Sequence, residues 1–272
     1  MHSESPVRDD LREGPVFVMD SGVGGTSVLA ALVTELPHEK FLYFGDSANA
    51  PYGEKPLEWV VARSRELVAT RINAGAKAVV IACNTATSAS AEILRAEHPE
   101  VPIVGIEPAL KPAARALPGG LILVMATPMT LKLDKYQHLA DEWGTGCTVV
   151  PVSCDGLAAA IEQDGPESDS VAQLVGKYVG PYHGKVDGVV LGCTHYPLAA
   201  GAVRSVLGDV PLFDGSLGTA RQLGRVLAEA GLLARRQGPG EVVFTTSSQD
   251  ASVLDSYRRL FEFGRATIPA QV

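Results

Sequence analysis

The sequence VVIACNTATSA, residues 79–89, joins a short apolar run to a cysteine and then to polar residues. A second stretch, VVLGCTHYPLA at 189–199, repeats this order 110 positions further along the chain. Short, β-branched apolar runs are typical of parallel strands buried on both faces. We therefore expect two buried strands, each of which delivers a thiol, Cys83 or Cys193, to a polar turn.

Seven further apolar runs have the same character, and segments with helical spacing, such as 57–74 and 218–234, separate most of them. This alternation predicts an α/β fold with mainly parallel central sheets. With the two runs above, the expected strands are residues 15–20, 40–45, 77–83, 101–106, 120–126, 147–152, 186–193, 210–214 and 241–246.

The order of motifs suggests an internal duplication. VFVMDSGVGG has a partner in ILVMATPMT, and the offset from Asp20 to Thr127, 107 positions, is close to that between the two cysteines. The alternative is that any two α/β halves share apolar strands and polar turns. We expect two pseudo-symmetric domains, one formed by residues 1–107 and 216–272 and the other by 108–215.

Open α/β sheets bind ligands beyond the carboxyl ends of their strands. Asp20, Gly45–Asp46, Cys83, Thr127 and Cys193 all stand at such ends. If the two domains face each other, these residues line one cleft, which is the expected active site.

Composition excludes several classes of protein. The 272 residues are 46% hydrophobic and 20% charged, with a net charge of −8 and no basic stretch interleaved with aromatic residues. Nucleic acid is therefore not expected as a partner. No apolar run is long enough for a membrane span and no signal peptide is recognisable, so we expect a cytoplasmic protein with no membrane partner. The four cysteines form no zinc-site spacing and are expected to be free thiols.

Cys83 is expected at the start of a helix, where amide groups and the helix dipole lower a thiol pKa from about 8.5. A lone cysteine is more often a small buried hydrophobe. The polar residues that follow, Asn84 and Thr85, favour a functional reading, because with the helix amides they suit a carboxylate ligand.

Cys193 is followed closely by His195, which could tune the thiol or assist its proton transfers. A histidine at a strand end is otherwise most often structural. Cys147 and Cys154 flank a strand without a comparable polar turn and are expected to be structural.

Two loops follow the first two expected strands. DSGVGG, residues 20–25, has glycines that permit a ligand to approach the backbone closely, but it matches no phosphate-binding motif. GDSANAPYG, residues 45–53, is either a substrate-contact loop or an ordinary connection.

The motifs DSGVGG, PYG, ACNTAT and GCTHYP, in this order and spacing, resemble the glutamate racemases of the cofactor-independent aspartate/glutamate racemase superfamily. The resemblance extends from about Pro15 to Leu260. It implies two α/β domains with the active site between them, and two cysteines that act as acid and base on opposite faces of the glutamate α-carbon.

Carried over by motif, the resemblance makes Cys83 and Cys193 the two acid/base groups, with Asp20 assisting the first and His195 the second. A family pattern of Cys-Pro-x-x-x-Pro-x-x-Glu survives here as CDGLAAAIE, without its prolines, and makes Glu162 a further helper. The implied substrate-binding residues are Ser21, Pro51, Tyr52, Gly53, Asn84, Thr85, Thr127, Thr130 and Thr194.

The resemblance also implies glutamate as the substrate, no cofactor and no metal, a homodimer, and a role in supplying D-glutamate for peptidoglycan. By family analogy Cys83 serves D-glutamate and Cys193 L-glutamate. No lysine stands at a strand end that could carry a pyridoxal Schiff base. The alternatives are an aspartate or hydantoin racemase, a single-cysteine decarboxylase, a thiol hydrolase using Cys193 and His195, and a non-catalytic binding protein.

Overall fold

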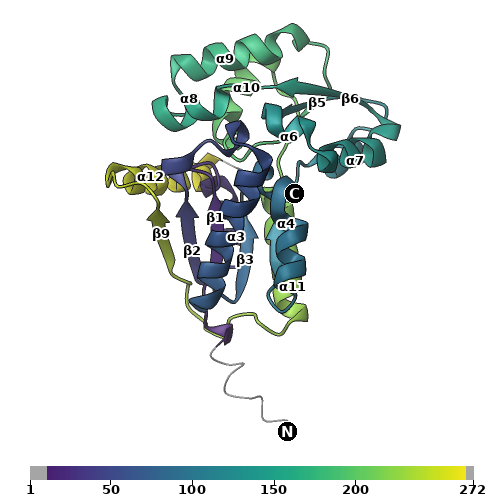
Figure 1. The fold of residues 1–272 in the computed structure, drawn as a ribbon. Helices are drawn as coiled ribbons and strands as arrows, with labels where there is room; N and C mark the ends of the chain where they lie inside the picture. The colour runs from purple at the N-terminus through teal and green to yellow at the C-terminus, as the bar shows by residue number, and fades with distance from the viewer. Residues whose placement is uncertain (1–10, 268–272) are drawn as a thin grey trace.

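The structure, a computed structural model, describes residues 11–267, apart from the side chains at 134, 135 and 145. Its strands form two separate sheets in which every pairing is parallel. All nine strands expected from the sequence are present, although each is one or two residues shorter at one or both ends. Figure 1 shows one sheet, with its helices, stacked above the other.

The first sheet has five strands and the second has four. In the first, the order is β4 (Ile103–Gly105), β3 (Ala78–Ile81), β1 (Val16–Asp20), β2 (Phe41–Gly45) and β9 (Val242–Thr246). In the second, it is β8 (Leu212–Phe213), β7 (Gly188–Leu191), β5 (Leu121–Ala126) and β6 (Thr148–Ser153).

The two strand orders show the pseudo-symmetry. The run β4-β3-β1-β2 of the first sheet matches β8-β7-β5-β6 of the second, strand for strand. The strands before the two cysteines, β3 and β7, are therefore equivalent, as are β1 and β5. The fold consists of two related α/β domains, as the spacing of the motifs predicts.

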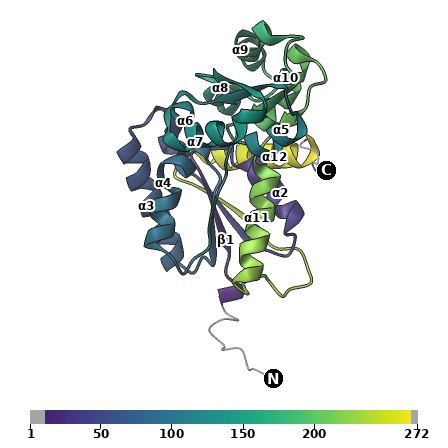
Figure 2. The same ribbon diagram turned by 90° about the vertical axis from the view of Figure 1, so that its right-hand side faces the viewer.

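Helices cover both faces of each sheet because successive strand residues point to opposite sides. In β1, Phe17 and Met19 pack on one side, and Val16 and Val18 pack on the other. Figure 2 shows α3 and α4 on one side of β1 and α2 and α11 on the other. These helices and the last one are α2 (Thr26–Glu35), α3 (Leu57–Asn73), α4 (Asn84–Glu97), α11 (Ser216–Glu229) and α12 (Ser252–Thr267).

The helices of the second sheet also form two groups. One contributes to an apolar cluster with the outer faces of β5 and β7, and the other packs into the larger core shared with the first domain. The first group is α5 (Leu110–Ala116), α6 (Pro128–Lys132) and α7 (Asp134–Trp143). The second is α8 (Leu157–Asp164), α9 (Asp169–Val179) and α10 (Ala200–Leu207).

Short helical turns complete the chain, and two of them lie in the loop after β2. The turns are η1 (Ser47–Asn49), η2 (Tyr52–Glu54), η3 (Gly144–Gly146), η4 (Gly180–Tyr182) and η5 (Tyr196–Ala199).

The helix predicted over 218–234, which is α11, ends earlier than expected, at Glu229, because Gly231 takes a positive φ of +67° and turns the chain away.

The chain leaves the first sheet after β4 and returns to it with β9, so the first sheet is built from two separate segments of the chain. This order accommodates the predicted boundaries at 107/108 and 215/216, which themselves stay a prediction. None of the helices described between residues 11 and 267 combines the length and apolar character needed to cross a bilayer.

Candidate active site

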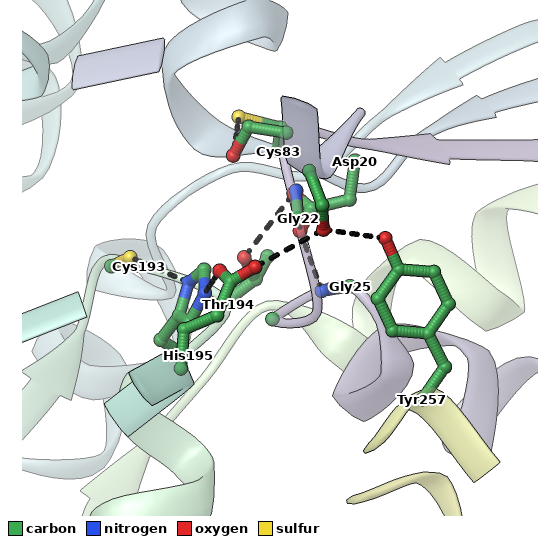
Figure 3. A network of polar contacts seen from close by, with 12 residues as sticks. Asp20, Gly22, Gly25, Cys83, Cys193, Thr194, His195 and Tyr257 are labelled. Carbon is green, nitrogen blue, oxygen red and sulfur yellow. Dashed lines mark hydrogen bonds and ion pairs between the residues drawn. The ribbon is translucent and has the colours of Figure 1, made fainter. Parts of the chain in front are cut away.

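Polar groups from the carboxyl ends of both sheets meet between the two domains. The Thr194 hydroxyl, after β7, lies 3.5 Å from Asp20 Oδ1, at the end of β1, and the Ser27 hydroxyl donates to the Thr194 carbonyl at 2.8 Å. Figure 3 shows Asp20 near Cys83, and His195 beside Cys193. The side chains that the sequence singles out at strand ends therefore form one site.

Cys83 is the N-cap of α4. Its sulfur accepts a hydrogen bond from the Ala86 backbone N–H at 3.5 Å, and its S–H points to the Ser21 hydroxyl at 3.8 Å. The thiol is only 5% exposed. Burial, and then the nearby Asp20 carboxylate, raise the pKa of Cys83 to about 12. The expectation that the helix start lowers this pKa is wrong, because one amide contact is outweighed by desolvation and by a negative neighbour.

Asp20 is fully buried at the turn after β1. Its Oδ2 accepts hydrogen bonds from the Gly22 N–H at 3.2 Å and the Gly25 N–H at 2.9 Å. Burial raises the pKa of Asp20, although the amide groups and the nearby His195 oppose this shift. When Asp20 is ionised, its negative charge raises the pKa of Cys83 and so favours the protonated thiol.

Cys193 has a different neighbour. Its sulfur lies 3.8 Å from Nδ1 of His195, whose Nε2 lies 3.0 Å from Oε2 of Glu162. Burial alone would lower the pKa of His195, but the contacts with Cys193 and Glu162 outweigh it and raise this pKa well above the usual value. His195 is thus suited to hold a proton beside Cys193, and Glu162 to stabilise the imidazolium.

The glycines of the DSGVGG turn have a role that the sequence does not reveal. A Cβ on Gly22 would overlap the Glu162 carboxylate, and a Cβ on Gly24 would overlap the His195 ring. Both side chains come from the second domain. The glycines thus permit a close approach of Glu162 and His195 to the turn of the first domain, whereas the close approach of a ligand stays a prediction.

The threonines expected to bind substrate converge across the domains. The Thr85 hydroxyl, at the start of α4, lies 3.5 Å from that of Thr127 and 3.4 Å from that of Thr130, which are themselves 2.9 Å apart. Gly53 faces Thr127 so closely that a Cβ would come within 3.3 Å of it. The small residue at 53 and the three hydroxyls therefore border one polar region.

Asn84 supplies an unsatisfied acceptor in this region. Its side chain is 4% exposed, and its Oδ1 has no hydrogen-bond partner within residues 11–267. A buried amide oxygen without a partner costs free energy, so such a group is suited to an N–H donor of a ligand. Pro51 directly precedes η2, the turn that contains Tyr52 and Gly53.

Several residues support the site through contacts that the sequence does not reveal. Asp46, which follows β2, accepts from the Tyr52 hydroxyl at 2.6 Å and from two nitrogens of Arg63 at 2.8 and 2.9 Å. This cluster anchors the loop that carries Tyr52 and Gly53. Asp46 and the adjacent Ser47 lie in a loop that the sequence marks as notable. Tyr257 lies 210 positions beyond Ser47, in the final helix, and has no local signal.

Cys147 and Cys154 take no part in the hydrogen bonds described above. The Cys147 thiol points to the Trp143 carbonyl at 3.7 Å, and the Cys154 thiol points to the Val152 carbonyl at 3.5 Å. All four cysteines are free thiols. Within the described part of the chain, no group of three or more His, Cys, Asp or Glu side chains is arranged to hold a metal ion.

Comparison of the sequence with known proteins finds one matching family and close similarity to curated proteins. The Asp/Glu/Hydantoin racemase family model matches residues 16–223. The glutamate racemase of Clostridium perfringens is 40% identical over 258 residues, which cover 94% of this chain and 99% of that protein.

Solved structures of glutamate racemases also superpose on this chain. The glutamate racemase of Francisella tularensis in complex with D-glutamate superposes with a TM-score of 0.79 at 26% identity, covering 94% of this chain and 95% of that one. The Escherichia coli enzyme in complex with L-glutamate and an activator also gives 0.79, at 28% identity, covering 91% and 95%.

Proposed function

The chain belongs to the Asp/Glu/Hydantoin racemase family, and we propose that it interconverts L- and D-glutamate by moving protons between the α-carbon and two thiols, Cys83 and Cys193. The observation that carries this proposal is the matched placement of the thiols. They follow equivalent strands of two related domains, and each has its own charged helper.

Two acid/base groups are needed because racemisation removes the α-proton from one face and returns a proton to the other. The neighbours of the two thiols divide these roles. His195, held by Glu162, can take the proton of Cys193 and leave a thiolate as the base. Cys83 keeps its own proton beside Asp20 and can deliver it as the acid. In the reverse direction the two thiols exchange roles.

The α-proton of an amino acid is very weakly acidic, so the carbanion-like state needs stabilisation by preorganised groups. We assign this task to the hydroxyls of Ser21, Thr85 and Thr194 and to the Asn84 side chain, whose buried Oδ1 suits the substrate ammonium group. Thr127 and Thr130, with the turn Pro51–Gly53, would bind the remainder of the substrate. This mechanism uses no cofactor and no metal.

Glutamate is preferred over aspartate or a hydantoin because the relatives that match nearly their whole length with this chain are glutamate racemases. The product, D-glutamate, would serve peptidoglycan synthesis, a cytoplasmic role in a bacterium. We further propose a homodimer, which light scattering after gel filtration would detect.

The direct test is incubation of the purified protein with L-glutamate, followed by chiral analysis. We expect a mixture of both enantiomers at equilibrium, an unchanged rate after dialysis against a chelator, and no need for pyridoxal phosphate. Aspartate and phenylalanine serve as controls and should turn over far more slowly. Faster turnover of aspartate would reassign the chain to another branch of the family, and no turnover of any amino acid would leave a binding protein.

A further inference from the structure

A line of hydroxyl groups links the final helix to the helpers of Cys193. The Tyr257 hydroxyl, on α12, lies 2.6 Å from the Ser47 hydroxyl, in η1. Ser47 Oγ lies 3.1 Å from Glu162 Oε1, and the other oxygen of Glu162 contacts His195. Tyr257 and Ser47 belong to the domain of the first sheet, whereas Glu162 is on α8, in the domain of the second sheet. The line therefore crosses from one domain to the other.

The direction of each hydrogen bond follows from the groups available. The hydrogen bonds of Glu162 with His195 and Ser47 overcome the effect of burial and hold its pKa below the usual value, so the carboxylate accepts. Ser47 has a single hydroxyl hydrogen, which it donates to Glu162. Tyr257 must then donate to Ser47, and burial raises the pKa of Tyr257 to about 12, so it keeps the proton that it needs.

The packing around Tyr257 indicates that this placement is specific. Its side chain is fully buried, and a Cβ on Gly45 would overlap its hydroxyl. The Thr246 hydroxyl lies 3.2 Å from the Tyr257 hydroxyl and can donate to it. Tyr257 therefore has a donor, an acceptor and a glycine that makes room for it.

The line has a consequence at His195. Because each oxygen of Glu162 has its own partner, the carboxylate is fixed in one orientation and receives the Nε2–H of His195. The remaining nitrogen, Nδ1, then faces the sulfur of Cys193. The Val23 backbone N–H also bonds to this carboxylate, so loss of the Ser47 hydroxyl would remove one of three anchors and would hold the carboxylate less firmly against the imidazole.

We propose that Ser47 and Tyr257 are positioning residues that orient Glu162, and through it His195, for the proton transfer at Cys193. This inference rests on the proposed racemase function. It adds two residues of the first domain to the half of the reaction that the second domain carries out, so that docking of the two domains completes the Cys193 side of the site.

The test compares Ser47→Ala and Tyr257→Phe with two matched controls. Ser205→Ala and Tyr178→Phe remove hydroxyls that donate to backbone carbonyls, at 2.9 and 2.5 Å, away from the site. Loss of a hydrogen bond to a charged group predicts a fall in kcat/KM of about tenfold to a hundredfold for Ser47→Ala, and loss of a neutral one roughly two- to tenfold for Tyr257→Phe. Ser47→Thr keeps the hydroxyl and should restore most of the activity.

Both enantiomers must lose kcat/KM by the same factor, because the equilibrium constant between mirror images is one. The informative readout is the isotope effect with α-deuterated substrates. If the transfer at Cys193 is slowed, the isotope effect should rise for the enantiomer whose proton Cys193 removes and fall for the other. A general structural weakening would leave the two isotope effects in their original ratio.

A double mutant gives a second readout. Because Tyr257 acts through Ser47, Tyr257→Phe should cost little in the Ser47→Ala background. An undiminished cost there, or unchanged isotope effects in both single variants, would overturn the inference. If Ser47→Ala does not fold, the isotope effects of Tyr257→Phe decide. A wild-type protein that does not racemise glutamate would instead refute the proposed function.

Discussion

Cys83 and Cys193 occupy equivalent positions in two domains, but the charges beside them differ. Cys83 faces a carboxylate and is driven toward the thiol, whereas Cys193 faces an imidazole that can accept its proton. The surroundings of the pair are therefore asymmetric, and in the mechanism that we propose Cys83 gives a proton while Cys193, through His195, takes one. A symmetric pair of two thiols would lack a base, and a pair of two thiolates would lack an acid.

The two thiols should be individually essential. Replacing either Cys83 or Cys193 by alanine removes an acid/base group from one face, and we expect racemisation to fall by at least roughly 10²- to 10⁴-fold. Chiral analysis of glutamate turnover measures this loss. Cys147→Ala is the matched control and should stay within a few-fold of the wild type, because that thiol points to the Trp143 carbonyl and packs against the apolar cluster beside β5 and β7. Full activity in either Cys83→Ala or Cys193→Ala would contradict the assignment.

At the scale of elements, the loop after β2 depends on one buried carboxylate. Asp46 binds Tyr52, Arg63 and Asn49, and so connects the two turns of the loop to α3. Burial alone would raise the pKa of Asp46, but these hydrogen bonds, that of Arg63 above all, lower it to about 2. A carboxyl group with a lowered pKa stabilises the folded state only while it is ionised.

The stability contributed by Asp46 should therefore depend on pH. It is fully present above the ordinary pKa of about 3.9 and is lost as the pH falls toward about 2. Asp46→Asn should lower the free energy of unfolding at pH 7 by about 2 kcal/mol, and by less at pH 3. Urea unfolding at the two pH values measures the difference. A cost that is equal at both, or larger at pH 3, would show that the charge of Asp46 does not matter.

The same elements show which features of the fold and site can be predicted from the sequence. The strands and the two thiol turns were predictable because apolar runs and polar turns are local features. The lowered pKa expected for Cys83 was wrong because its shift depends on burial and on Asp20, 63 positions away. Tyr257 was not predictable, since its partner Ser47 is far away in the sequence and only the packing of α12 brings them together.

At the scale of the molecule, the two ends of the first sheet serve different purposes. The carboxyl ends carry the site, whereas the amino ends hold a buried ion pair between Lys77, just before β3, and Glu39, just before β2. Lys77 also donates to the carbonyls of Arg12 and Leu232, at 2.6 and 2.9 Å. This cluster ties the segment after α11 and the start of the described chain to the sheet.

The buried pair should affect stability and not catalysis. Glu39→Gln leaves the Lys77 charge without its carboxylate, which typically costs about 3–5 kcal/mol of unfolding free energy. Arg65→Gln breaks a comparable but exposed pair, with Glu97, and should cost no more than about 1 kcal/mol. Both proteins, while folded, should retain kcat/KM within a few-fold. A large loss of activity in folded Glu39→Gln would show that the two ends of the sheet are coupled.

The central claim is that two different groups serve the two faces of the α-carbon, and a reaction in heavy water tests it most directly. Protonated L-glutamate is mixed with the protein in D₂O, and the α-deuterium content of both enantiomers is followed from the first turnovers. The two-thiol account predicts that the D-glutamate formed carries deuterium from the start, because its proton comes from the thiol on the opposite face, which has exchanged with solvent. The remaining L-glutamate should stay largely protonated. Equal early labelling of substrate and product would contradict the account, because a single group would then serve both faces.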